Sequence, residues 1–295
     1  MRIGLVGAGN IGGHFAARWL DAGHRVVVRD VNPVIMDQMD DLGADAASSL
    51  EDLALQVDVV CLSLPLPGTV LEVARGIASS RTRAGLVVDL STTGAKVTQE
   101  VDELLRHAGI AFLSAPVSGG TVAAAQGQLT VMAAGTKAAY EQARPVLEVI
   151  GRNLFYLGGD VRLGQSLKLI NNTLYAINMI ASCEALVCGT KAGLDGSTML
   201  DVINRSSGRS FATLERMQGA LDRSFPVRFT MALLRKDVAL ALAAAQELGV
   251  PMHVTQQALH LLDLAIADGL GDADNVAAIQ TIERQAGVVF SGAAS

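Results

Sequence analysis

Two polar residues on an otherwise apolar helix are the strongest candidates for chemistry in this sequence. Lys168 and Asn172 lie one helical turn apart in residues 164–192, a helical pattern with almost no interruption. A polar seam within about 40° of Lys168 on a helical wheel is formed by Asn172, Tyr175, Met179 and Ser182. A buried lysine can exchange a proton near neutral pH, whereas arginine cannot. The wheel leaves two interpretations open: a general acid–base, or a lysine that extends its ammonium to solvent.

The first thirty residues show a pattern typical of dinucleotide binding. A short apolar strand at residues 2–6 leads into the turn Gly7-Ala8-Gly9-Asn10-Ile11-Gly12 and then into an amphipathic helix. The first glycine permits the tight turn, the second lets backbone approach a pyrophosphate, and the third permits close packing of helix and strand. Free N–H groups at the helix start can bind phosphate. We therefore expect cofactor contacts from Gly7, Gly9, Asn10, Ile11 and Gly12.

Asp30 ends the second predicted strand, where a ribose-binding carboxylate is expected. A carboxylate accepts hydrogen bonds from ribose hydroxyls and repels a 2′-phosphate. The next residue, Val31, carries no charge, and Arg29 is expected to point to the opposite face of the strand. The sequence therefore favours NAD over NADP.

Apolar strands alternate with helical patterns as far as about residue 157. We predict strands near 2–6, 25–29, 58–62, 86–90, 110–113, 128–133 and 153–156, and helices near 10–22, 33–41, 69–78, 94–107 and 137–150. Such alternation predicts an α/β Rossmann-type doubly wound, mostly parallel sheet.

After Gly164 the predicted strands stop and helices follow, with breaks at Gly193, residues 206–208, Pro226 and residues 249–251. We therefore expect a dinucleotide-binding domain over residues 1–162, a long interdomain helix over 163–192 and an all-α domain over 193–295. The cleft between the two domains is the expected active site, because ligands of open α/β sheets bind beyond the carboxyl ends of the strands.

Composition narrows the function classes. The chain has 295 residues, 50% of them hydrophobic, and a formal net charge of −6, which disfavours a nucleic-acid surface. No apolar run approaches membrane-spanning length, and the early first strand leaves no room for a signal peptide, so a cytoplasmic protein is expected. Five histidines without ligand spacing imply no metal. Three cysteines in apolar stretches are expected to be buried thiols: Cys61, Cys183 and Cys188.

Five motifs in order resemble the β-hydroxyacid dehydrogenases, a family that includes 3-hydroxyisobutyrate dehydrogenase and tartronate semialdehyde reductase. The resemblance covers essentially the whole chain. Its motifs are the glycine turn Gly7–Gly12, Asp89-Leu90-Ser91-Thr92, Ala115-Pro116-Val117-Ser118-Gly119-Gly120, Gly164 through Lys168 to Asn171-Asn172, and Lys236-Asp237. The chain departs from the family pattern at Ser114, where an acidic residue is usual, at Ala123, where glycine is usual, and at Arg162, where glycine is frequent.

The resemblance implies interconversion of a 3-hydroxy carboxylic acid and its semialdehyde by hydride transfer. Lys168 is then the general acid–base and Asn172 orients the substrate. Ser118 and the amides of Gly119 and Gly120 are placed to hold a substrate carboxylate, since a glycine-rich turn presents several N–H groups to an anion. The family further implies cofactor contacts from Leu64, Pro65, Thr69, Thr92 and Lys236. An apolar helical domain with Leu259, Leu261, Leu262, Leu264 and Ile266 indicates a homodimer or homotetramer.

Three alternatives stay open. 6-Phosphogluconate dehydrogenases resemble this chain but have a much larger helical domain. Imine reductases are similar as well, yet generally lack a lysine at the position of Lys168. A non-catalytic nucleotide-binding module of the same fold is the third alternative, and such relatives lose the catalytic lysine.

Overall fold

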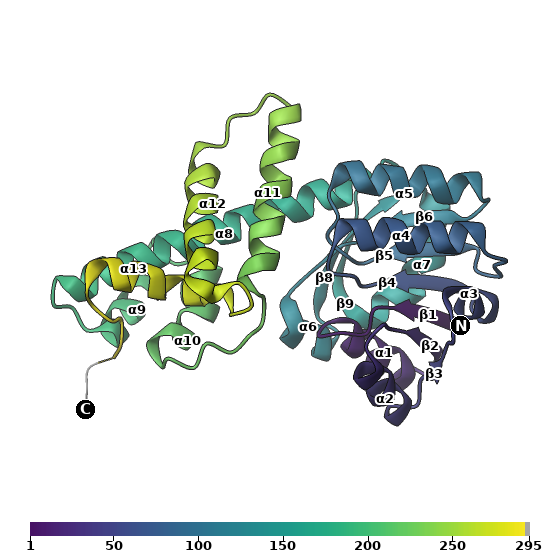
Figure 1. Ribbon diagram of the computed structural model, residues 1–295, viewed down its shortest axis with the longest axis horizontal. Coiled ribbons are helices and arrows are strands. Elements are labelled where there is room, and N and C mark those ends of the chain that lie inside the picture. Colours follow the sequence, from purple (N-terminus) through teal and green to yellow (C-terminus); the bar gives the residue numbers. More distant parts are fainter. Residues whose placement is uncertain (293–295) are drawn as a thin grey trace. The chain divides into compact units, whose positions relative to one another are not determined.

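The computed structural model describes residues 1–292 and divides into two compact units (Figure 1). The first unit is Met1–Lys168, and the second begins at Leu169. The division falls inside helix α8 (Arg162–Lys191), so one continuous helix contributes residues to both units. The three-part division expected from the sequence remains a prediction.

A sheet of nine strands forms the centre of the first unit, in the order β3-β2-β1-β4-β5-β6-β8-β7 with β9 beside β8. The strands are β1 (Arg2–Val6), β2 (Arg25–Arg29), β3 (Asp45–Ala46), β4 (Val59–Leu62), β5 (Leu86–Asp89), β6 (Ala111–Ser114), β7 (Val117–Ser118), β8 (Leu129–Gly135) and β9 (Gly151–Tyr156). The six neighbouring strands β3, β2, β1, β4, β5 and β6 are parallel to one another. Strand β8 runs antiparallel to both β6 and β7. The predicted mostly parallel, doubly wound sheet is confirmed.

Helices cover both faces of this sheet because successive strand side chains alternate between them. In β4, Val59 and Cys61 belong to one hydrophobic core, and Val60 and Leu62 to the other. The helices of this unit are α1 (Gly12–Asp21), α2 (Pro33–Asp41), α3 (Leu50–Gln56), α4 (Pro67–Ser79), α5 (Ala95–His107), α6 (Gly120–Gln126) and α7 (Lys137–Ile150). Helices α4 and α5 lie side by side (Figure 1), while α1 contacts α6 and α7.

Four short elements were absent from the sequence prediction: β3, α3, β7 and α6. Helix α3 does carry an N-terminal signal, because the hydroxyl of Ser49 accepts a hydrogen bond from the N–H of Asp52. Strands of two residues and helices of seven are too short to establish a hydrophobic period, which explains why the pattern missed them.

The described part of the second unit is helical, with one isolated bridge between Thr230 and Asp274. Beyond α8 it comprises α9 (Gly196–Asn204), η1 (Ala212–Arg216), α10 (Gln218–Leu221), α11 (Met231–Glu247), α12 (His253–Ala265), η2 (Ile266–Leu270), η3 (Asn275–Ala277) and α13 (Ala278–Ala286). The four predicted breaks all fall between these elements.

Helix α8 is the one described helix whose length and composition would allow it to span a membrane, a possibility that the sequence prediction had not recognised. Its inward side chains fill two hydrophobic cores of the second unit, one through Met179 and Cys183 and the other through Ala176 and Ile180. The helix is therefore the central core helix of that unit. Cys188 lies on its outer side and is exposed, so the expectation of three buried thiols was wrong for this residue.

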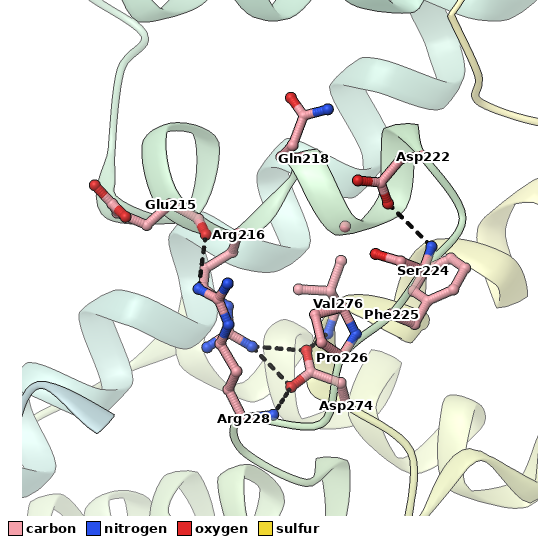
Figure 2. A pocket seen from close by; sticks show the side chains of 11 residues that line it. Glu215, Arg216, Gln218, Asp222, Ser224, Phe225, Pro226, Arg228, Asp274 and Val276 are labelled. Atoms are coloured by element: carbon pink, nitrogen blue, oxygen red, sulfur yellow. Dashed lines mark hydrogen bonds and ion pairs between the residues drawn. The ribbon is translucent and has the colours of Figure 1, made fainter. Parts of the chain in front are cut away.

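A buried carboxylate joins the loops of the second unit. Asp274 is 1% exposed, and both of its oxygens accept hydrogen bonds from Nη2 of Arg216, at 2.7 and 2.8 Å (Figure 2). The backbone N–H groups of Arg228, Phe229 and Val276 donate to the same carboxylate at 2.8 to 3.1 Å. Asp274 thus connects η1, the segment before α11, and η3.

Candidate active site

The glycine turn between β1 and α1 has the geometry that a dinucleotide requires. Gly7 has a φ of 89°, and a Cβ there would collide with the carbonyl oxygen of Ser63. A Cβ on Gly12 would collide with the carbonyl oxygen of Gly7, so the helix packs directly against the turn. A Cβ on Gly9 would meet nothing within 4 Å, which leaves backbone next to open space. These three positions fit a bound dinucleotide, with Gly9 as the point of pyrophosphate approach.

Asp30 is held against this turn. Its Oδ2 accepts a hydrogen bond from the N–H of Ala8 at 2.8 Å, and its Oδ1 accepts one from the N–H of Asn32 at 2.9 Å. Each carboxylate oxygen can accept further hydrogen bonds, so both can still receive ribose hydroxyls. Val31 is 94% exposed, but Nη1 of Arg29 donates to the carbonyl oxygen of Asp30 at 2.7 Å. The Arg29 guanidinium therefore folds back onto the backbone of Asp30.

The other expected cofactor residues follow the next two parallel strands. Leu64 and Pro65 lie in the loop between β4 and α4, Thr69 lies in the first turn of α4, and Thr92 lies in the loop after β5. The N–H of Leu64 donates to Oγ of Ser91 at 2.9 Å, which ties the ends of β4 and β5 together. Since the carboxyl ends of parallel strands share one edge of a sheet, these residues and the glycine turn lie along the same edge.

The proposed anion-binding loop is a tight connection from β7 into α6. Ser118 is the last residue of β7 and pairs with Thr130 of β8. Gly119 and Gly120 have φ values of 134° and 68°, which disfavour other residues. Helix α6 begins at Gly120, so the early N–H groups of this helix lie in the loop. The backbone geometry suits contact with a carboxylate.

Lys168 is 9% exposed, so most of its side chain is buried, as expected for a lysine with a chemical role. The residue one helical turn before it, Gln165, was not recognised from the sequence and is fully buried. Its amide forms hydrogen bonds with the loop after β5 and with Ser114 of β6. Ser114, one of the departures from the family pattern, is therefore a partner of the helix that carries Lys168.

The second unit contains a buried network around Asn172. Its Nδ2 donates to Oδ2 of Asp237 at 2.6 Å, while its Oδ1 accepts a hydrogen bond from Nδ2 of Asn171 at 3.2 Å. The ammonium of Lys236 lies 3.2 Å from Oδ1 of Asp237, whose side chain is 3% exposed. Asp237 is thus a second residue whose role the sequence prediction missed. Its place beside Lys236 on the buried side of α11 was the available signal.

The polar seam predicted on α8 ends at Tyr175. Burial raises the pKa of this phenol, so it stays protonated at neutral pH and donates to Oδ1 of Asn275 at 2.7 Å. Its ring meets Phe211 edge-on. Beyond it, Met179 belongs to a hydrophobic core, and the hydroxyl of Ser182 donates to the carbonyl of Asn178 in its own helix. The last two seam residues are therefore structural.

Comparison with known proteins agrees with this geometry. Residues 2–158 match the model described as the NAD binding domain of 6-phosphogluconate dehydrogenase. Residues 163–282 match the model described as NAD-binding of NADP-dependent 3-hydroxyisobutyrate dehydrogenase. The chain is 35% identical over 296 residues to 2-(hydroxymethyl)glutarate dehydrogenase of Eubacterium barkeri, covering 99% of this chain and 98% of that protein. The chain belongs to the β-hydroxyacid dehydrogenase family.

Other members of the β-hydroxyacid dehydrogenase family are similarly close. The NAD-dependent L-serine dehydrogenase of Pseudomonas aeruginosa is 34% identical, with 92% of this chain and 95% of that protein covered. The structure of Mycobacterium tuberculosis 3-hydroxyisobutyrate dehydrogenase with L-serine superposes with a TM-score of 0.86 at 29% identity, covering 95% and 98% of the two chains. An imine reductase of Streptomyces aurantiacus has a TM-score of 0.67 at 18% identity, which shows a shared fold alone, with 96% and 99% covered. The protein is a nicotinamide-dependent hydroxyacid dehydrogenase.

Proposed function

We propose that this enzyme interconverts a 3-hydroxy carboxylic acid and its semialdehyde, with Lys168 as the general acid–base. The observation that carries this proposal is the burial of Lys168 on a helix turn that Gln165 ties to the loop after β5. That loop contains Thr92, one of the expected cofactor residues. A dinucleotide-dependent dehydrogenase needs its acid–base close to the cofactor, and this connection supplies the link within one unit.

Each proposed residue has a defined chemical task. The glycine turn and Asp30 would hold the dinucleotide, which would supply hydride transfer at the carbon that carries the substrate hydroxyl. Nζ of Lys168 in its neutral form accepts the hydroxyl proton during oxidation and gives it back during reduction. Ser118 and the amides of Gly119 and Gly120 hold the substrate carboxylate. Asn172, fixed by Asp237, orients the substrate.

A panel of 3-hydroxy acids assayed by nicotinamide absorbance tests this function. The names of the relatives supply its first members: 2-(hydroxymethyl)glutarate, L-serine and 3-hydroxyisobutyrate. We expect at least one acid to be oxidised, and we expect its methyl ester to react with a much higher KM because the loop at Ser118 binds an anion. Equal KM values for acid and ester would contradict the carboxylate-binding role, and inactivity with every hydroxy acid would contradict the proposed reaction.

We further propose NAD as the preferred cofactor, supported by the position of Asp30 beside the glycine turn. A higher kcat/KM is expected with NAD than with NADP. The double variant Asp30→Ala, Val31→Arg is expected to move the preference toward NADP, because it removes the repelling carboxylate and adds a cation for the 2′-phosphate. Asp45→Ala, a carboxylate in an exposed ion pair with Arg25, is the matched control. Unchanged selectivity in the double variant would exclude Asp30 as the determinant.

The assembly is proposed to be a cytoplasmic homodimer or homotetramer. The apolar residues of α12 that prompted this expectation are largely accounted for by the core of their own unit: Leu262 is buried, and Leu259 and Leu261 pack against it. Support comes instead from exposed apolar residues on the outer side of α8, namely Leu163, Leu167, Ile170 and Leu174. Sedimentation at equilibrium distinguishes these assemblies from a monomer.

A further inference from the structure

The first turn of α8 is joined to the sheet by one fully buried amide. Oε1 of Gln165 accepts hydrogen bonds from the N–H groups of Thr93 and Gly94, at 2.9 and 3.3 Å. Its Nε2 donates to the carbonyl oxygen of Ser91 at 3.0 Å and to Oγ of Ser114 at 3.4 Å. The side chain is 0% exposed, and these contacts use both of its donors and its acceptor.

Three of the four partners of Gln165 belong to the loop after β5, which has further hydrogen bonds of its own. The N–H of Ser91 donates to Oδ1 of Asp89 at 2.9 Å, and the hydroxyls of Thr93 and Thr98 lie 2.8 Å apart. Thr92 lies between two residues whose backbone groups bond to Gln165. The amide therefore joins α8 to a segment that has few other conformations available.

A close backbone approach brings α8 against the same edge of the sheet. A Cβ on Gly164 would lie 2.6 Å from the carbonyl oxygen of Met132 and 3.3 Å from Cδ of Pro116. Gly164 thus allows α8 to pack closely against the sheet, and the hydrogen bonds of Gln165 fix the orientation of this helix turn. Pro116 begins the segment that leads to Ser118. The first turn of α8 therefore contacts two loops of the proposed site, the one after β5 and the one that contains Ser118.

Lys168 follows Gln165 by three residues, and side chains three residues apart lie on the same side of a helix. We propose that Gln165 is a positioning residue that holds Lys168 at the correct distance from the loop Ser91–Gly94, and so from the reacting atoms. This inference rests on the proposed role of Lys168. A displacement of about 1 Å in a reacting group can cost about a hundredfold in rate, so four hydrogen bonds that define one helix turn can have a large effect on turnover.

The test is a double-mutant cycle between Gln165 and Lys168. Gln165→Met keeps the approximate size of the side chain and removes all four hydrogen bonds. We expect kcat to fall by about 10- to 100-fold with a smaller change in the KM for substrate. In a Lys168→Ala background, the same change is expected to alter the residual rate by less than about twofold, because no lysine remains to be positioned.

Ser166→Ala is the matched control, since it removes a hydrogen bond within the same helix turn, from Oγ to the carbonyl of Arg162, and leaves the sheet contacts in place. If Gln165→Met does not fold, Gln165→Glu replaces it in the cycle, because glutamate keeps the size and acceptor but lacks both N–H donors. An equal loss in the presence and absence of Lys168 would overturn the positioning role. A Lys168→Ala enzyme with wild-type activity would instead overturn the proposed function itself.

Discussion

Replacing Lys168 with alanine is expected to lower kcat by about a hundred- to ten-thousand-fold, the usual cost of losing a positioned general acid–base. Lys168 is 9% exposed and is proposed to exchange a proton with substrate, whereas the glycine turn and Asp30 are proposed to bind the dinucleotide. Circular dichroism and the Kd for NAD are therefore expected to stay near wild-type values. Steady-state kinetics, together with these two measurements, separate loss of chemistry from loss of fold.

Lys168→Arg is the more discriminating variant. Arginine keeps the positive charge but cannot release a proton near neutral pH. We expect this variant to be as inactive as Lys168→Ala, since charge alone does not accept the hydroxyl proton. Near wild-type oxidation by the arginine variant would show that another group, or a solvent molecule, is the base.

Replacing Asp274 with alanine is expected to destabilise the second unit by about 3–5 kcal/mol. Arg216 would lose its buried carboxylate partner, and three backbone N–H groups would lose their acceptor. Urea unfolding followed by circular dichroism measures this loss. The chain has a single tryptophan, Trp19, buried in the first unit, so its fluorescence follows that unit separately.

Asp263→Ala provides the comparison for Asp274. Asp263 pairs with Arg235 at 2.8 Å, but both side chains are more than 40% exposed. Such pairs contribute about 1 kcal/mol or less because solvent screens them. If the Asp274 variant lost no more stability than this control, the buried pair would not organise the second unit.

Local sequence determined how much of the fold could be predicted. The β1 strand, the glycine turn, α1 and Asp30 form one continuous segment of about thirty residues with clear local signals, and β1 and α1 were placed to within two residues. The direction of β8 could not be inferred, because an antiparallel strand beside a parallel sheet has the same apolar pattern as a parallel one. The direction of β8 is determined by its hydrogen-bond pairing with β6 and β7, which are distinct segments of the chain.

The two residues missed at the site have distant partners. Gln165 bonds to residues more than 50 positions earlier in the chain, and Asp237 accepts from an amide 65 positions away. A glutamine on an apolar helix has no periodic signal that sets it apart from a solvated residue, and Asp237 was noted only as the neighbour of Lys236, with no role of its own. Their roles follow from tertiary packing, whereas Lys168 was identified because a lysine is unusual on such a helix.

The cysteines give each unit its own reporter of unfolding. Cys61 in β4 and Cys183 in α8 are completely buried, and burial raises the pKa of both thiols, so neither supplies the thiolate that alkylating reagents attack. Cys188 is exposed and reacts without unfolding. After Cys188 has been blocked, labelling of Cys61 requires the first unit to open, and labelling of Cys183 requires the second to open. The native sequence therefore permits the opening free energies of the two units to be compared in one sample, with no engineered probe.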